Sequence, residues 1–66
     1  MLLGYFREYK GYTGTIEYFI EDGYYGKLHN IKDLVNYEAS NVEHLYEMFK
    51  ESVDEYIAFK KEVGVE

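Results

Sequence analysis

Apolar and polar side chains alternate along the first half of the chain, as expected for strands with one covered face. In the longest such segment, Tyr12–Ile20, the two faces are Tyr12, Gly14, Ile16, Tyr18 and Ile20, and Thr13, Thr15, Glu17 and Phe19. A turn at Glu21-Asp22-Gly23 leads to a returning strand at Tyr24–Leu28. A loop or bulge at His29–Asp33 precedes a short third strand, Leu34–Glu38. Because these strands are short and consecutive, they predict an antiparallel meander.

The second half of the chain has the 3.6-residue period of one long helix. Ser40 and Glu43 match the S-x-x-E capping box at its start, and Gly64 suits its end. The apolar stripe comprises Val42, Leu45, Tyr46, Phe49, Val53, Tyr56, Ile57 and Val63. About 22 residues give a helix roughly 33 Å long. This length exceeds what three short strands can cover, so we expect its far end to extend past the sheet.

The apolar side of this helix is wide. Met48, Ser52 and Phe59 extend the stripe to about half of the circumference, more than one sheet needs. This flank packs either on loops or on Met1–Phe6, or else its Met48 and Phe59 contact a second chain. Met1–Phe6 itself is compatible with an extension of the first strand, an edge strand or a loose arm.

Composition narrows the class of protein. The chain has 66 residues, 47% of them hydrophobic and none of them cysteine, which indicates one small domain without disulfides or thiolate metal sites. It has no apolar run of roughly 20 residues and no signal peptide, so we expect a cytoplasmic protein. Acids outnumber bases 13 to 7. This balance disfavours nucleic acids and anionic membranes as partners and favours a basic protein.

Residues for catalysis are sparse. Ser40 and Ser52 lie in no nucleophile motif, and His29 and His44 lack a metal-ligand spacing. The acids of the strand region are scattered over strands and turns: Glu17, Glu21, Asp22, Asp33 and Glu38. A two-metal nuclease needs converging carboxylates. We therefore expect no enzyme activity, no metal and no cofactor.

Two further features argue against phosphate binding. Gly11 and Gly14 lack the spacing, the lysine and the following helix of a phosphate loop. They are better explained by close backbone approach or a bulge. The basic residues form no run, so we expect no nucleic-acid binding by this chain alone.

Several short motifs follow one another along the chain in a particular order and spacing. In the strand region they are Tyr9-Lys10-Gly11-Tyr12-x-Gly14-x-Ile16-Glu17-Tyr18, Glu21-Asp22-Gly23, Tyr25-Gly26-Lys27 and Ile31-x-Asp33-Leu34-Val35-x-Tyr37-Glu38. In the helix they are Ser40-x-x-Glu43-x-Leu45, Phe49-x-Glu51-x-Val53-Asp54-x-Tyr56 and Lys61-Glu62-x-Gly64. Over about residues 9 to 64, this order and spacing resemble the HicB family of bacterial antitoxins.

The resemblance implies a partly degraded, RNase H-like β-β-β-α domain without an established catalytic site. It also implies a partner, a small RNA-cleaving toxin called HicA, which the antitoxin blocks by direct contact. Related chains usually continue through a Pro-containing linker into a ribbon-helix-helix segment, whereas this sequence stops at Glu66, which puts operator binding in doubt. Lys60 stands where relatives often carry Cys or another small or apolar residue, and residues 1–8 lie outside the match.

Together these observations predict an α+β domain, in which a three-stranded antiparallel sheet is packed by one long helix. We expect an antitoxin-like module that occludes a basic ribonuclease, with Glu17, Tyr25, Lys27 and Asp33 as contact residues. We also expect a homodimer that associates through Met48 and Phe59. One alternative is a residual metal-dependent nuclease of RNase H type, which needs Glu17 and two more carboxylates. Another is an orphan remnant without an active partner.

Overall fold

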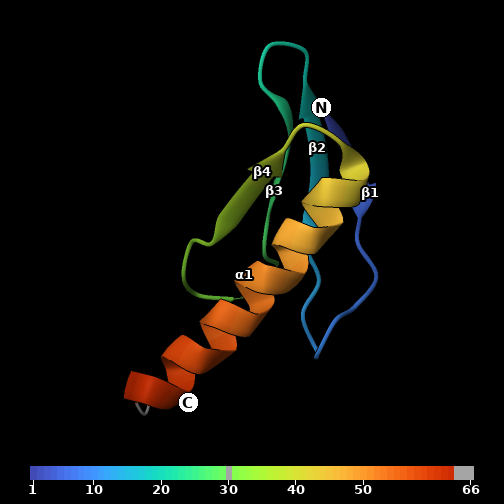
Figure 1. Cartoon of the computed structure of the whole chain (residues 1–66). Coiled ribbons are helices and arrows are strands. Elements are labelled where there is room, and N and C mark those ends of the chain that lie inside the picture. The colour runs from blue at the N-terminus through green and yellow to red at the C-terminus, as the bar shows by residue number, and fades with distance from the viewer. Residues whose placement is uncertain (30, 64–66) are drawn as a thin grey trace.

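The computed structural model describes residues 1–29 and 31–63, which form a four-stranded antiparallel sheet with one helix packed on one face (Figure 1). The strands follow the order of the chain across the sheet: β1 (Leu2–Tyr5), β2 (Thr15–Phe19), β3 (Gly23–Lys27) and β4 (Asn36–Ala39). The helix α1 spans Val42–Val63. The α+β class, the meander and the long C-terminal helix are therefore confirmed.

The prediction of three strands is wrong, because residues Leu2–Tyr5 add a fourth strand at the edge of the sheet. In β1, Leu2 pairs with Glu17 and Gly4 with Ile16, with a bulge between the two pairs. The connection to β2 folds back on itself at Lys10 and Gly11, which both have positive φ angles (54° and 88°). This is the geometry of a two-residue hairpin turn, and Tyr9 and Tyr12 exchange backbone hydrogen bonds of 2.7 and 3.0 Å across it.

The predicted strands are present with shorter or shifted bounds. The regular ladder of the first one is Thr15–Phe19, extended by an isolated bridge between Gly14 and Leu28. The turn falls one residue earlier than predicted, since the Asp22 N–H donates to the Phe19 carbonyl (3.0 Å) and Gly23, at φ 84°, already pairs with Phe19. The third predicted strand moves toward the helix, from Leu34–Glu38 to Asn36–Ala39.

The predicted capping box is wrong. The side chain that caps α1 is Asn41, whose Oδ1 accepts a hydrogen bond of 2.7 Å from the His44 N–H. The Asn41 carbonyl accepts the first helical bond, from the Leu45 N–H (2.9 Å). Ser40 lies one residue too early for this role. Gly64 and the side chain of Val63 lie outside the described part of the chain.

The core lies between α1 and the inner face of the sheet. Leu45, Phe49 and Val53 of α1 are completely buried. Tyr37 reaches across the neighbouring strand, and its hydroxyl donates to the Thr15 carbonyl (3.0 Å). Burial raises the pKa of this hydroxyl well above its usual value, and the negative charge of Glu17 adds to the shift.

Two glycines make room for the Tyr37 ring. A Cβ atom at Gly26, the cross-strand partner of Tyr37, would collide with that ring and with the Thr15 carbonyl. A Cβ at Gly14 would collide with the Tyr37 hydroxyl. The sequence predicts close backbone approach or a bulge at both Gly11 and Gly14. At Gly14 the close neighbours are instead the side chains of Tyr37 and Phe49. The side of Gly11 faces open space, and its positive φ serves the turn.

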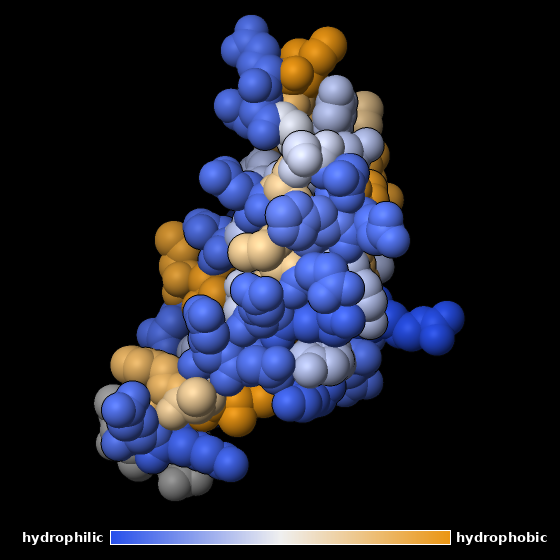
Figure 2. Space-filling view, in the orientation of Figure 1, coloured by the Kyte–Doolittle hydropathy of each residue, from blue (hydrophilic) through white to orange (hydrophobic). Residues whose placement is uncertain are grey.

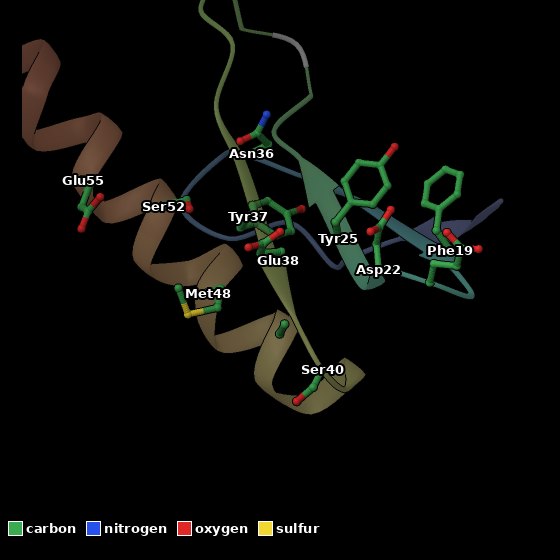
Figure 3. A pocket seen from close by; sticks show the side chains of 12 residues that line it. Phe19, Asp22, Tyr25, Asn36, Tyr37, Glu38, Ser40, Met48, Ser52 and Glu55 are labelled. Atoms are coloured by element: carbon green, nitrogen blue, oxygen red, sulfur yellow. The ribbon is translucent and has the colours of Figure 1, made fainter.

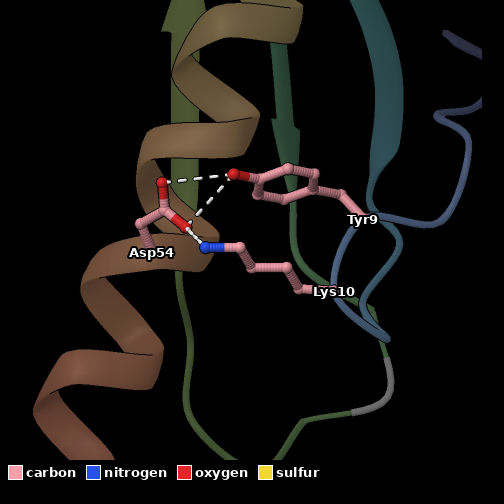
Figure 4. Close-up of polar contacts among 3 residues, drawn as sticks. All are labelled: Tyr9, Lys10 and Asp54. Atoms are coloured by element: carbon pink, nitrogen blue, oxygen red, sulfur yellow. Dashed lines mark hydrogen bonds and ion pairs between the residues drawn. The ribbon is translucent and has the colours of Figure 1, made fainter.

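The helix is longer than the sheet is tall. The described structure measures 39 × 17 × 16 Å, and the last turns of α1 extend past the strands (Figure 1). Near the middle of α1, Asp54 accepts hydrogen bonds from Lys10 Nζ (2.8 Å) and from the Tyr9 hydroxyl (3.3 Å), as Figure 4 shows. The contact with Lys10 lowers the pKa of Asp54 and ties the β1–β2 connection to the helix.

Candidate functional site

The sheet face opposite α1 is uncovered and carries a row of polar and aromatic side chains. Glu17 of β2 is directly opposite Tyr25 of β3, and Tyr25 is directly opposite Glu38 of β4. Cross-strand partners share a face, so these three side chains lie in one row. Lys27 and Asn36 form the next row on the same face.

Three of the four predicted contact residues are therefore brought together. Glu17 and Tyr25 are half-buried and Lys27 is exposed on the open face. Asp33 is separate from them, because it lies in the loop before β4 and lines a small hollow on the helix side with Ser52 and Phe59. Their role in binding a partner stays a prediction.

Hydrogen bonds hold part of this face in place. The Thr15 hydroxyl donates to the Glu17 carboxylate (2.9 Å) and accepts from the Lys27 backbone N–H (3.0 Å). The ring of Tyr25 stacks on that of Phe19 with centroids 5.1 Å apart. Partial burial raises the pKa of Tyr25, and the negative charge of Glu17 raises it further.

A groove begins on this face and continues around the edge of β4 to α1, and we call it the β4 groove (Figure 3). It is lined by Phe19, Glu21, Asp22, Tyr25, Asn36, Tyr37, Glu38, Ala39, Ser40, Met48, Ser52 and Glu55. Four of these side chains are carboxylates, and no lysine, arginine or histidine is among the lining residues. The β4 groove is therefore an open, acidic depression that also exposes apolar and aromatic side chains.

The two predicted self-association residues lie in different surroundings. Met48 is half-buried, packs against the core and lines the β4 groove. Phe59 is 53% exposed on the part of α1 that lies toward its C-terminal end. Figure 2 shows hydrophilic side chains over the outward side of α1 and hydrophobic ones at the margins of the molecule. Self-association through these residues stays a prediction.

Among the described residues, no group of three His, Asp or Glu side chains is placed to hold a metal ion. The His29 ring packs edge-on against Tyr5, and the exposed His44 lies in the first turn of α1. Ser40 and Ser52 line the β4 groove, and in the described part of the chain neither hydrogen-bonds to a histidine. No helix in that part combines the length and apolar character needed to cross a bilayer.

Sequence reasoning missed the β4 groove. It treated Glu21, Asp22 and Glu38 as scattered acids and did not single out Glu55. Alternation along a strand reveals which face a residue occupies, but it does not reveal which strand ends up at the edge of the sheet beside the helix. Met48 and Ser52 are the two groove residues whose helical positions indicated an unusually wide flank.

Comparison with protein-family models, with curated proteins and with solved structures finds no match to this chain.

Proposed function

We propose that this chain is an antitoxin-like, protein-binding module that neutralises a small basic ribonuclease of the HicA type by covering its RNA-binding surface. The observation that carries the proposal is the open sheet face, where the row of Glu17, Tyr25 and Glu38 continues into the acidic β4 groove. A ribonuclease must attract phosphates, so a net charge of −6 attracts its active surface at long range. Such a toxin acts in the cytoplasm, and its antitoxin belongs there too.

The order β2-β3-β4-α1 supports the degraded RNase H-like interpretation, with β1 as an addition at the edge. The same geometry disfavours the residual-nuclease alternative. Glu17 and Glu38 lie two strands apart with Tyr25 between them. At the usual strand spacing, their backbones are roughly 10 Å apart. A two-metal site needs several converging carboxylates, and among the described residues no group of three His, Asp or Glu side chains is placed to hold a metal ion.

The test is an RNA-cleavage assay with the toxin-like protein encoded by the reading frame next to this gene. We expect the wild-type chain to suppress cleavage and the double variant Glu17→Lys/Glu38→Lys to lose at least tenfold in inhibitory potency. The double variant Glu51→Lys/Glu62→Lys is the matched control, because it makes the same charge change at two exposed positions on α1 outside the groove.

Two outcomes would contradict the proposal. One is a neighbouring frame that encodes no small basic protein, which would favour the orphan remnant. The other is RNA cleavage by the toxin that continues unchanged in the presence of excess wild-type chain.

A further inference from the structure

We propose that the free edge of β4 is a strand-addition site, at which the basic partner inserts an extended segment that alternates lysine or arginine with small apolar residues. This inference rests on the proposed function and specifies how the partner is held. Strand addition at an exposed sheet edge is a general mode of peptide recognition, in which backbone hydrogen bonds provide affinity and alternate side chains provide specificity.

The backbone of β4 has hydrogen-bonding groups available on its outer side. The Leu28 N–H donates to the Val35 carbonyl (2.9 Å). This bond shows which residue pairs between β3 and β4 are hydrogen-bonded and which are not. In an antiparallel ladder, bonded residues alternate with residues whose N–H and C=O point away. Tyr37 therefore bonds inward to β3, whereas Asn36 and Glu38 direct their backbone groups toward the free edge.

The two sides of this edge differ in chemistry, which defines the side chains of the incoming segment. On the open face, the next strand would lie beside Asn36 and Glu38, where a carboxylate favours a cation. On the helix side it would lie beside Tyr37, Met48 and Ser52, where space next to the core favours a small apolar residue. Because successive side chains of a strand point to opposite faces, one alternating segment satisfies both sides.

The negative charge of the β4 groove disfavours a second copy of this chain as its occupant. Among the residues that the structure describes, four carboxylates and no basic side chain line the β4 groove. Two copies paired edge to edge through β4 would bring both sets of carboxylates together, which is unfavourable. A segment carrying several cations neutralises the same carboxylates, so the groove suits a basic partner.

The experiment is an NMR titration of the whole chain with an eight-residue peptide of alternating lysine and valine. We expect amide hydrogen exchange at Asn36 and Glu38 to slow at least tenfold when the peptide saturates the chain. The Tyr37 amide, already within the ladder, serves as an internal reference. Binding without slower exchange at Asn36 and Glu38 would overturn the inference.

N-methylated peptides test the backbone contribution directly, because only every second amide of an added strand faces β4. We expect methylation of one alternate set to weaken binding at least tenfold and methylation of the other set to change it less than twofold. The sensitive set is the lysine amides for an antiparallel strand and the valine amides for a parallel one. Equal effects of the two sets would mean attraction by charge alone and would refute strand addition.

Side-chain variants complete the test. Glu38→Lys should weaken binding of the lysine-valine peptide at least tenfold, and Glu51→Lys less than twofold; equal losses would refute a specific groove. Failure of this inference is distinguishable from failure of the proposed function. Toxin neutralisation without peptide binding at the edge removes only the inference, whereas edge binding by the peptide without neutralisation removes only the function.

Discussion

β1 and β4 are both four-residue edge strands, yet they expose opposite chemistry. In β1, Leu2, Leu3 and Tyr5 are each more than half exposed, and the strand carries no charged side chain. In β4 the exposed residues are Asn36 and Glu38, beside an acidic groove. An apolar, uncharged edge can pack against another apolar surface. An acidic edge repels the same edge of a second copy and attracts a basic protein.

The two edges are also attached to the molecule in different ways. β4 is fixed by Tyr37, which lies across Gly26 and Gly14, and it leads almost directly into α1. β1 pairs through a bulge, a feature that disrupts the ladder at exposed edges and limits their pairing with other chains. A binding edge requires a defined position, so the firmly held strand is the better site for specific recognition.

The largest expected effect comes from breaking the attachment of β4. Gly26→Val should destabilise the domain by at least about 3 kcal/mol, because the added atoms overlap the Tyr37 ring and the Thr15 carbonyl. Urea unfolding followed by circular dichroism measures this loss. Leu3→Ala is the control on the other edge, where an exposed side chain should change stability by less than about 0.5 kcal/mol. Comparable losses in the two variants would remove the distinction between the edges.

The second effect concerns self-association. We expect a homodimer at micromolar concentration, weakened at least about tenfold by Phe59→Glu, since covering one large side chain contributes about 1.5–3 kcal/mol. Sedimentation equilibrium measures it, with Leu3→Lys as the companion variant. A dimer that resists Phe59→Glu but dissociates with Leu3→Lys would move the interface to the β1 edge. A monomeric wild-type chain would contradict self-association altogether.

A smaller effect is expected from removing the Tyr37 hydroxyl, which hydrogen-bonds to β2 across the intervening strand β3. Tyr37→Phe leaves the buried Thr15 carbonyl without this donor and should cost about 1–2 kcal/mol. Because the pKa of Tyr37 is raised on folding, its contribution is complete below the unfolded pKa of about 10 and declines as pH rises above it. Urea unfolding between neutral and alkaline pH should therefore show a steeper decline for the wild-type chain. Parallel declines would mean that Tyr37 does not cause the shift.

The smallest effect concerns the junction of β4 and α1. Asn41→Ala should reduce stability by about 1 kcal/mol through loss of the cap, whereas Ser40→Ala should cost less than about 0.5 kcal/mol. Thermal unfolding of the two variants side by side gives the comparison. The reverse ranking would restore Ser40 as the cap and place the start of the helix one residue earlier.

Sequence periodicity predicted the elements whose signal is local. The β2–β3 hairpin follows from alternation and the Asp-Gly turn, and α1 from its apolar stripe. β1 could not be predicted with certainty, because Leu2-Leu3-Gly4-Tyr5 does not alternate and its bulge breaks the period. The cap was ambiguous because Ser40 and Asn41 are adjacent and both residue types cap helices well.

For the candidate site too, the sequence predicts the features that depend on local pattern but not those that depend on long-range packing. The shared face of Glu17, Tyr25 and Lys27 follows from a period of two along each strand and from the register of a hairpin. The separation of Asp33 and the closeness of Glu38 and Met48 do not follow from any local pattern. They depend on how β4 pairs with β3 and how α1 crosses behind it, and both are long-range features.

The extension of α1 past the sheet has a consequence for how the domain melts. Leu45, Phe49 and Val53 anchor the first half of the helix in the core, whereas Phe59 is 53% exposed in the second half. The last turns have few tertiary contacts to hold them, and a short helical segment is marginal in water by itself. On heating, part of the far-ultraviolet helix signal should therefore fade gradually, before the cooperative loss of the near-ultraviolet tyrosine signal. In calorimetry, the enthalpy of the cooperative transition would therefore be that of a chain shorter than 66 residues.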